Sequence, residues 1–508
     1  MSALPEVMPL DEHNRALLAN VRPPDWVNPE PARRYNLVVV GAGTAGLVSA
    51  AGAAGMGAKV ALVERHLMGG DCLNVGCVPS KTLVRSARAL ADVRRASRLG
   101  VQLAGDASAD FAEVMERVRR VRAGISPHDS ARRFCEIYGV DVFLGSGRFV
   151  GRDEVEVGGA TLRFERAVIA TGARAAVPPI EGLAEAGFLT NETVFNLTER
   201  PTRLAVVGGG PIGCELAQAF ARLGSRVTII EMAERLLPRE DDDAVAVLHA
   251  ALERDGVELR LATTLERVEG TGSRRLLHLA SGEERSTLEA DAILVAVGRA
   301  PNVEALGLPA AGVRCGRGGV EVDDLLRTAN RRIYAAGDVC SAARFTHAAD
   351  FAARAVIQNA FFGFAGRKRV SRLVIPRCTY TDPEIAHVGL SVRDAAAAGI
   401  ELATFTVPMA EVDRAVTEGE RDGFVAIHVR TGTDRIAGAT IVGRDAGDLI
   451  SEIAVAMAGK LGLGDLASVI HPYPTRAEAI RKAGDLYNRT RLTEGRAKLL
   501  ARYFAWRR

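Results

Sequence analysis

The chain carries the same strand, glycine-rich turn, helix and strand pattern twice. The first copy begins with the apolar run 35–40, continues through GAGTAG and a helix of small residues, and ends its second strand at Glu64. The second copy begins at 204–207, continues through GGGPIG and ends at Glu231. The three glycines and the terminal Glu of the second copy each lie 167 residues after their counterparts in the first. This pattern is typical of βαβ dinucleotide-binding folds, so we predict two of them in one chain.

The three glycines of each turn serve different purposes. The first permits the tight turn, the second lets the backbone approach a pyrophosphate, and the third lets the helix pack closely on the strand. These residues are Gly41, Gly43 and Gly46 in the first copy and Gly208, Gly210 and Gly213 in the second. The phosphates would lie at a helix N-terminus, where unbonded N–H groups and the helix dipole favour anions. Glycine-rich turns also occur for purely conformational reasons, but a flanking strand, helix and terminal Glu in both copies favour nucleotide binding.

Composition excludes several classes of protein. A length of 508 residues is enough for about three domains. With 65 Lys and Arg against 62 Asp and Glu, the net charge of +3 gives no reason to expect a nucleic-acid partner. Seven cysteines are too few for an extracellular disulfide framework, which favours a reducing, cytoplasmic setting. We expect neither a secretory signal in residues 1–34 nor a membrane-spanning segment.

Further strand-and-turn segments come after each repeat. Residues 165–180 run from a strand into an ATG turn, and residues 291–302 have the same character. RRIYAAGDV places Asp338 at the end of another strand. From about Arg377 short strands alternate with helices. We therefore predict an α/β protein with two Rossmann-like domains and a C-terminal α+β domain.

Two cysteines, Cys72 and Cys77, come after the first repeat within MGGDCLNVGCVPSK. In a straight helix, positions five apart are separated by about 140° around the axis and about 7.5 Å along it, too far for a disulfide. The helix must therefore be distorted here, and Gly76 and Pro79 permit this. The spacing does not fit a zinc knuckle, so we expect no resident metal ion. A helix start with Lys81 nearby lowers the pKa of a thiol, which favours a redox-active pair over two packing cysteines.

With these residues the chain resembles the class I pyridine nucleotide-disulfide oxidoreductases, and the mercuric reductase-like branch in particular. The string CLNVGCVPSK carries the resemblance most specifically, and the match extends over residues 35–485. It implies FAD on the first repeat, with Glu64 on the adenosine ribose, and a nicotinamide nucleotide on the second. Electrons would pass from the nicotinamide to the flavin and on to the disulfide, with Cys77 facing the flavin and Cys72 attacking the substrate.

The same resemblance implies a set of site residues. The cofactor-binding residues are Gly41, Gly43, Gly46, Glu64, Gly70, Lys81, Thr171, Gly172, Gly208, Gly210, Gly213, Glu231, Gly298 and Asp338. The catalytic residues are Cys72, Cys77, Lys81, Glu215, Tyr473 and Glu478, with Lys81 and Glu215 forming an ion pair beside the flavin. A carboxylate at Glu231 accepts ribose hydroxyls and repels a 2′-phosphate, so we predict NADH as donor. Arg235 and Arg239 leave NADPH open.

The resemblance also sets the domain boundaries that we expect. They are an N-terminal extension at 1–34, the first part of the FAD-binding domain at 35–190, an NAD(P)-binding domain at 191–310, the FAD-binding return segment at 311–374, a dimerisation domain at 375–485 and a basic tail at 486–508. The tail alternates Arg and Lys with aromatic and leucine side chains. It is either a helix docked on the dimer or an amphipathic segment that contacts an anionic membrane surface.

The chain departs from the glutathione and lipoamide enzymes near its end. Those enzymes have a His-Pro-Thr segment with a catalytic His, whereas HPYPTRAEA places Tyr473 at that position and His471 two residues earlier. A Tyr, with a reference pKa near 10, is a poor proton acceptor at neutral pH. Mercuric reductases also have a Tyr here, and reduction of a thiolate-bound metal ion needs soft ligands more than a base. However, this chain has no N-terminal CxxC domain and no vicinal cysteine pair near its end, since its last cysteine is Cys378.

We therefore predict a homodimeric FAD-dependent oxidoreductase that passes electrons from NAD(P)H through Cys72 and Cys77 to a thiol-reactive acceptor. The favoured acceptor is a metal ion such as Hg(II). In the dimer, Tyr473 and Glu478 would reach the dithiol of the other subunit. Two alternatives remain open. One is a dihydrolipoamide dehydrogenase-like or other small-disulfide reductase in which His471 is the base, and the other is a non-enzymatic redox-sensing flavoprotein.

Overall fold

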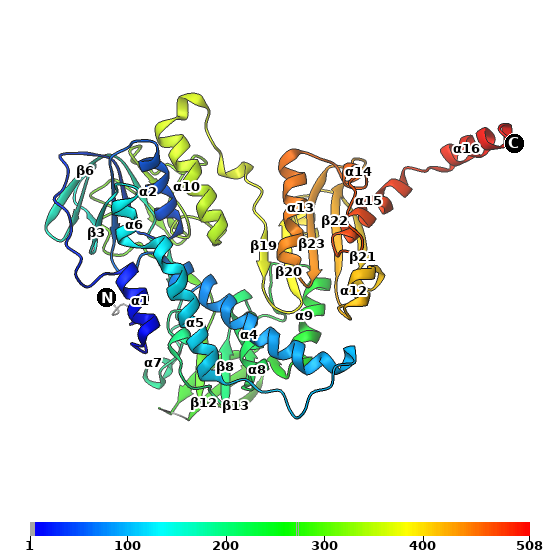
Figure 1. Cartoon of the computed structure of the whole chain (residues 1–508), viewed down its shortest axis with the longest axis horizontal. Coiled ribbons are helices and arrows are strands. Elements are labelled where there is room, and N and C mark those ends of the chain that lie inside the picture. The colour runs from blue at the N-terminus through cyan, green and yellow to red at the C-terminus, as the bar shows by residue number, and fades with distance from the viewer. Residues whose placement is uncertain (1–5, 271, 273) are drawn as a thin grey trace. The chain divides into compact units, whose positions relative to one another are not determined.

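The computed structural model describes residues 6–270, 272 and 274–508, and the chain divides into two compact units. The first unit consists of Met1–Arg94, Ala104–Met232 and Arg260–Leu373. The second consists of Arg95–Leu103, Ala233–Leu259 and Val374–Arg508. Figure 1 labels the main helices and strands of each unit.

The first repeat forms the central part of a parallel sheet in the first unit. Strand β1 (Tyr35–Val40) pairs in parallel with β2 (Val60–Glu64) on one side and with β6 (Ala160–Ile169) on the other. β3 (Asp141–Leu144) extends the sheet beyond β2, and β18 (Ile333–Ala335) pairs in parallel with β6. The central strands are almost entirely apolar and buried, as expected for a parallel sheet covered on both faces.

Small residues allow two helices of this unit to pack together. α2 (Thr44–Gly55) comes directly after the first glycine-rich turn and packs against α10 (Thr346–Phe361), as Figure 1 shows. Alanines on the facing sides of both helices are buried in the same apolar cluster as β1 and β2. The contact brings the start of α10, far along the sequence, next to the first repeat.

The second repeat forms a similar but smaller parallel arrangement in the same unit. β8 (Arg203–Val207) leads through the second glycine-rich turn into α8 (Pro211–Arg222) and on to β9 (Arg226–Ile230). β8 pairs in parallel with β9 and with β14 (Ala292–Val295). An antiparallel layer of β11 (Thr264–Glu269), β12 (Arg275–Ser281) and β13 (Glu284–Ala290) comes after β9 in the chain. The predicted α/β class with two Rossmann-like folds is confirmed.

The N-terminal segment is an ordered part of the first unit. α1 (Glu12–Val21) begins at an Asp11 cap and packs against α5 (Phe111–Ile125). After α1 the chain runs along the parallel sheet, where Trp26 Nε1 donates to the Val142 carbonyl over 3.2 Å. The N-terminal segment therefore packs on α5 and on the sheet that contains the first repeat.

The second unit contains an antiparallel sheet with helices. Its strands have the order β19 (Arg377–Thr379), β20 (Glu384–Gly389), β23 (Ile436–Gly443), β22 (Phe424–Arg430) and β21 (Leu402–Pro408). α13 (Ala446–Gly459) packs on β20 and β23, and α15 (Glu478–Thr490) packs on β21 and β22. This is the α+β arrangement predicted for the C-terminal region.

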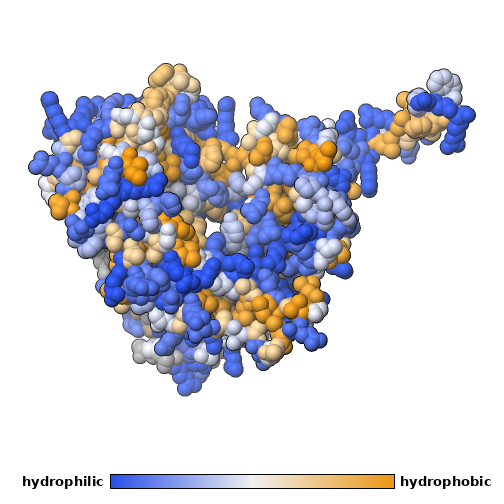
Figure 2. Space-filling model, in the orientation of Figure 1, coloured by the Kyte–Doolittle hydropathy of each residue, from blue (hydrophilic) through white to orange (hydrophobic). Residues whose placement is uncertain are grey.

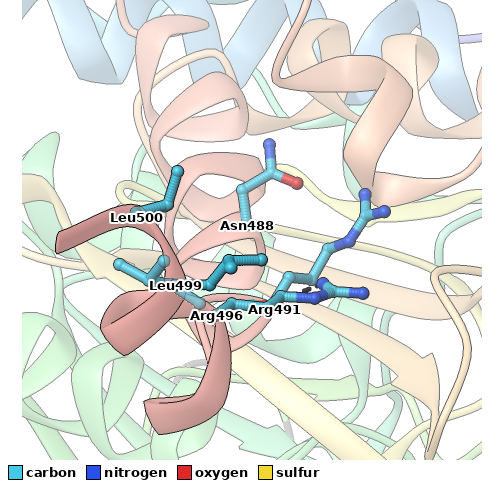
Figure 3. Close-up of a pocket in the computed structure, with 6 residues that line it drawn as sticks. Asn488, Arg491, Arg496, Leu499 and Leu500 are labelled. Carbon is cyan, nitrogen blue, oxygen red and sulfur yellow. Dashed lines mark hydrogen bonds between the residues drawn. The ribbon is translucent and has the colours of Figure 1, made fainter. Parts of the chain in front are cut away.

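The basic tail forms a final helix, α16 (Glu494–Trp506), in which no residue is buried. It continues from α15 away from the five-stranded sheet (Figure 1) and shows both hydrophilic and hydrophobic residues in Figure 2. α15 and α16 line a cavity of about 440 Å³ formed by Asn488, Arg491, Leu492, Arg496, Leu499 and Leu500 (Figure 3). Both interpretations of the tail stay predictions. In the described part of the chain, no helix is long and apolar enough to cross a membrane.

Candidate active site

The helix that carries the two cysteines is broken between them. Cys72 lies within α3 (Gly70–Asn74), and Cys77 is the first residue of α4 (Cys77–Arg95). A side chain at Gly76 would come within 2.7 Å of the Asp71 carbonyl oxygen, so the break leaves room only for glycine. Pro79 lies in the first turn of α4, where a missing N–H costs no helical hydrogen bond. The expected distortion is thus confirmed, and it brings the two thiols into hydrogen-bonding contact.

The pair shares one proton unequally. A hydrogen bond from Cys72 lowers the pKa of Cys77 to about 6, although burial and the Glu215 carboxylate act in the opposite direction. The Thr346 hydroxyl, 3.4 Å from the Cys77 sulfur, and the Lys81 ammonium also lower it. The hydrogen bond to Cys77 and burial raise the pKa of Cys72. At pH 7 the pair therefore holds a thiolate at Cys77 and a thiol at Cys72.

An ion pair joins this helix to the second repeat. Lys81 Nζ on α4 lies 2.7 Å from a carboxylate oxygen of Glu215 on α8. The Glu215 side chain is buried and the Lys81 side chain is about one-third exposed. The structure thus brings together four of the predicted catalytic residues, and the charge at Lys81 is held near the thiolate.

The first glycine-rich turn is closely packed. Gly41 has φ of +105°, and a side chain at Gly46 would lie 1.8 Å from the Gly41 carbonyl oxygen. A side chain at Gly70 would lie 2.5 Å from the Cα of Gly43, so the turn before α3 lies directly against the nucleotide-binding turn. At the end of β2, Glu64 accepts a 2.7 Å hydrogen bond from the Ala42 N–H. Burial raises the pKa of Glu64.

The second turn repeats this geometry. Gly208 has φ of +113°, and a side chain at Gly213 would lie 2.0 Å from its carbonyl oxygen. Glu231 accepts a 2.6 Å hydrogen bond from the Gly209 N–H, as Glu64 does in the first copy. α8 begins after Gly210 with no side-chain cap, and a side chain at Gly210 would meet none of the described residues within 4 Å. The N–H groups of this helix start are open to an anion.

The ATG turn lies against the first repeat. A side chain at Gly41 would lie 3.0 Å from the Cα of Thr171, whose hydroxyl donates to the Asn302 carbonyl over 2.7 Å. The Gly172 carbonyl accepts the Asn302 N–H over 2.9 Å, and the carbonyl of Gly298 accepts the Ala176 N–H over 2.9 Å. These bonds hold the two strand-and-turn segments together.

Asp338 lies just after β18, among charged side chains. Its carboxylate is 3.7 Å from Nε of Arg299, which also pairs with Asp71. Burial raises the pKa of Asp338. The Nε atoms of Arg299 and Arg344 are buried without a hydrogen-bond partner among the described residues. Two incompletely bonded cationic groups thus lie in the unit that carries the first glycine-rich turn.

The C-terminal candidates lie in the second unit, and each has its own hydrogen-bond or ion-pair partner there. Tyr473 is 71% exposed, and its hydroxyl donates to Asp413 over 2.9 Å. That hydrogen bond raises the pKa of Tyr473. The His471 side chain is only 5% exposed, and its Nε2 lies 2.9 Å from Glu452 on α13. Glu478 begins α15 and pairs with Arg481 at 3.1 Å.

Two family models match nearly the whole chain. The model described as pyridine nucleotide-disulphide oxidoreductase matches residues 35–356, and the dimerisation domain of the same group matches residues 375–484. The chain belongs to the pyridine nucleotide-disulphide oxidoreductases. The match to the dimerisation domain supports a homodimer.

Relatives within this family have different names. A mercuric reductase of Bacillus cereus is 35% identical over 90% of this chain and 72% of its own length. A dihydrolipoyl dehydrogenase of Chlamydia muridarum is 34% identical over 87% of this chain and 95% of its own length. Among solved structures, the HOCl-induced flavoprotein disulfide reductase RclA of Escherichia coli has a TM-score of 0.79 at 29% identity, covering 89% of this chain and 100% of that chain. A Cu(II) complex of RclA matches with a TM-score of 0.78 at 29% identity over 88% of this chain and 98% of that chain.

Members of this oxidoreductase family depend on FAD and take electrons from NAD(P)H, and the residues present fit both groups. At the first repeat, the glycines leave a path for a pyrophosphate. The buried Nε–H groups of Arg299 and Arg344 have no hydrogen-bond partner among the described residues, so each is left to donate. At the second, the uncapped start of α8 and the Glu231 carboxylate are the groups that a nicotinamide nucleotide requires.

Four residues near the dithiol were missed in the sequence analysis. Thr346 contacts Cys77, Arg299 pairs with Asp71, and Asn191 Nδ2 donates to the Val75 carbonyl over 3.2 Å. Arg299 comes directly after Gly298 and Asp71 precedes Cys72, so their positions within recognised motifs could have indicated them. Thr346 and Asn191 lie far from the cysteines in sequence, and no local pattern connects them.

Proposed function

We propose that this protein passes an electron pair from NAD(P)H, through FAD and the Cys72–Cys77 pair, to a thiol-reactive metal ion such as Hg(II). FAD supplies the two-electron relay between nicotinamide and sulfur. In this proposal Cys77 faces the flavin and Cys72 is the thiol that meets the acceptor. We also propose the domain boundaries expected from the sequence, and NADH as the donor.

One observation carries the choice of acceptor. The residue that aligns with the catalytic His of disulfide reductases is an exposed Tyr with a raised pKa, so it holds its proton at neutral pH. A disulfide acceptor requires two protons for its two leaving thiolates, and a base must move them. Hg(II) requires two electrons and no proton to become Hg(0). An acceptor of this kind therefore suits a site that has a thiolate and a protonated phenol.

The dithiol has the chemistry that such an ion selects. Thiolates are soft ligands, which bind Hg(II) and Cu(I) in preference to harder ions. The low pKa of Cys77 supplies one thiolate at neutral pH, and binding of the metal ion would displace the proton of Cys72. In the proposed dimer, the exposed Tyr473 of one subunit would face the dithiol of the other. The Cu(II) complex of the similar RclA supports including copper among the acceptors tested.

A second candidate is a small-disulfide reductase with His471 as the base. The 2.9 Å contact between His471 and Glu452 favours it, because a carboxylate orients an imidazole for proton transfer. Burial of the His471 side chain stands against it, since the base must reach a disulfide on another molecule. A slowly cycling redox sensor is the non-enzymatic alternative.

An acceptor screen separates these functions. Anaerobic NADH oxidation is measured with Hg(II), Cu(II), lipoamide and oxidised glutathione for the wild type, Tyr473→Phe and His471→Ala. We expect the Hg(II) rate to exceed the lipoamide rate by on the order of a hundredfold and to survive His471→Ala, because no base is required. Cys135→Ser, an exposed cysteine away from the pair, serves as the control.

Two outcomes would overturn the proposal. Lipoamide turnover that exceeds the Hg(II) rate and disappears in His471→Ala would establish the disulfide reductase. Flavin that is reduced by NADH but oxidised slowly by every acceptor would establish the sensor.

A further inference from the structure

Side chains from distant parts of the chain hold the turn between the two cysteines. The Asn74 carbonyl accepts a 2.7 Å hydrogen bond from Nη1 of Arg122 on α5, and the Val75 carbonyl accepts one from Asn191. The Asn74 side chain donates to the carbonyls of Met68 at 3.0 Å and Gly70 at 2.8 Å. The Asn74 and Val75 carbonyls lie at the end of α3, where helical partners are lacking. The break in the helix is therefore held from outside as well as by its own sequence.

Arg122 is unusual because it is buried and donates to neutral oxygens. Its guanidinium is among the largest fully buried side chains, and its Nη2 donates to Asn14 Oδ1 over 2.6 Å. Among the described residues its Nε has no hydrogen-bond partner. Burial lowers the pKa of Arg122 to about 10, so the group remains charged at neutral pH. A buried charge held by an amide oxygen and a carbonyl is costly, so its position depends on both of these oxygens.

Asn14 is itself fixed by the N-terminal segment. It is fully buried on α1, its N–H donates to Asp11 over 2.8 Å, and its Nδ2 donates to the Pro9 carbonyl over 2.7 Å. Asp11 also pairs with Arg119, one turn before Arg122 on α5. Asn14, Arg122 and Asn74 thus form a buried chain of contacts from the N-terminal segment to the cysteine turn.

The same segment also holds the stretch that leads into the turn. The Met68 N–H donates to the Val21 carbonyl over 3.1 Å. Arg22 donates from one nitrogen to the carbonyls of Arg65 at 2.8 Å and His66 at 2.7 Å. Residues 65–76 are therefore attached to the N-terminal segment directly before Cys72, and through Arg122 after it.

We propose that the N-terminal segment, residues 6–34, positions the turn between Cys72 and Cys77. Asn14 and Arg122 are the positioning residues, and they set how readily the two cysteines form a disulfide. The proposal rests on the redox role of these cysteines in the proposed function. Both residues act through the main chain of α3 rather than through the sulfurs. The segment is thus part of the redox machinery of this chain.

The physical consequence is a change in the disulfide equilibrium. A disulfide requires a narrow range of distances between the two Cα atoms and a fixed dihedral angle. When the turn is held in this geometry, the effective concentration of one thiol at the other is high. A loosened turn lowers this effective concentration. Loss of the Asn14 contact should therefore disfavour the disulfide and weaken the hydrogen bond that lowers the pKa of Cys77.

The test compares two asparagines on the same helix. Asn14→Ala removes the acceptor for Arg122, whereas Asn20→Ala removes a side chain that bonds to Ser126 instead. The holoenzyme is equilibrated with mixtures of oxidised and reduced dithiothreitol, quenched with iodoacetamide and analysed by mass spectrometry. Each exchange transfers two electrons from the Cys72–Cys77 pair to the reagent disulfide, which opens to its dithiol. At pH 7 one of the two protons that this dithiol takes up comes from Cys72 and the other comes from the solvent, because Cys77 is already a thiolate.

We expect Asn14→Ala to lower the equilibrium constant for disulfide formation by about three- to tenfold, since the effective concentration of the thiols falls. The pH midpoint for alkylation of Cys77 should rise in the same variant. Asn14→Asp, which keeps an oxygen for Arg122, should restore both values. Asn20→Ala should leave both unchanged.

A purely structural role predicts something different. If Asn14→Ala lowers the melting temperature but leaves the equilibrium constant and the alkylation midpoint at wild-type values, the positioning role is wrong. Should Asn14→Ala not fold, Asn14→Ser is measured in the same way, since its shorter hydroxyl cannot replace the amide. Failure of the proposed acceptor chemistry would show in the wild-type screen instead, because this equilibrium involves no acceptor.

Discussion

The two nucleotide repeats have nearly the same local geometry, although we propose different chemistry for them. In both, the first glycine has a positive φ. A side chain at the third glycine would lie at about the same distance from the carbonyl oxygen of the first glycine in each repeat. In both, the terminal Glu accepts an N–H from the residue after the first glycine, at 2.7 Å for Glu64 and 2.6 Å for Glu231. The repeats differ in the segment that comes after this Glu. The binding fold is thus shared, and the downstream segment decides which repeat carries redox sulfur.

After Glu64 the chain turns back onto its own glycine-rich turn. Gly70 lies against Gly43, and the dithiol helix starts a few residues later. After Glu231 the chain leaves the first unit at Met232. Close contact of the downstream segment with the nucleotide turn is therefore a feature of the first repeat, which is where we propose that the flavin and the disulfide meet.

The largest expected effect comes from filling the third glycine of either repeat. Gly46→Ala and Gly213→Ala each place a methyl group within 2.0 Å of a carbonyl oxygen. Such overpacking costs about 1–3 kcal/mol or more and displaces the helix start that receives the phosphates. We expect Gly46→Ala to purify without flavin. Gly213→Ala should stay yellow, resist reduction by NADH and still be reduced by dithionite.

Absorbance spectra before and after each reductant measure this difference. Gly52→Ala, on α2 beyond the turn, serves as a control because its added methyl group meets only a side-chain carbon at 3.9 Å among the described residues. Loss of flavin from Gly213→Ala, with Gly46→Ala unaffected, would reverse the assignment of the two repeats.

The next effect concerns the sulfur pair that distinguishes the first repeat. Cys72→Ser should keep the Cys77 thiolate beside the flavin and show a thiolate-to-flavin charge-transfer band without reduction. Cys77→Ser should lose that band. Both should lower NADH-driven acceptor turnover by on the order of a thousandfold, because the pair acts as one unit. A band that persists in Cys77→Ser would exchange the roles of the two thiols.

A smaller effect tests the ion pair that joins the repeats. The Cys77 thiolate, with its pKa lowered to about 6, is present at pH 7 and is lost as the pH falls through 6. Lys81→Met removes a charge that lowers this pKa, so the midpoint of the charge-transfer band should rise by about one pH unit. Glu215→Gln removes a charge that raises it, so that midpoint should fall. Spectra recorded from pH 5 to pH 9 check both signs.

If Lys81→Met and Glu215→Gln shift the midpoint in the same direction, this account is wrong. That result would mean that loss of the partner displaces Lys81, so that the pair acts as one group. Lys59→Met, which breaks an exposed ion pair with Asp141 in the same unit, should leave the midpoint in place.

The sequence predicted the features that short-range patterns encode. Glycine spacing and apolar runs located both repeats, and helix geometry predicted the break that occurs at Val75 and Gly76. Sequence did not reveal Thr346 beside Cys77 or Arg122 beneath Asn74, because both contacts depend on packing between segments more than 40 residues apart. The pairing of His471 with Glu452 was also missed, although it bears on the acceptor.

The smallest expected effect distinguishes the two terminal glutamates. Glu231 is partly exposed and Glu64 is buried, so a change at Glu231 should alter donor choice without loss of flavin. Glu231→Gln keeps a hydrogen-bond acceptor for the ribose but no longer repels a 2′-phosphate. We expect the ratio of kcat/KM for NADH to that for NADPH to fall by about tenfold, which corresponds to about 1.4 kcal/mol. Because Arg235 is engaged with Asp242 and the Glu240 carbonyl, it should add little attraction for the extra phosphate. An unchanged ratio would mean that Glu231 serves only to bind the Gly209 N–H, and that donor choice lies elsewhere in the second repeat.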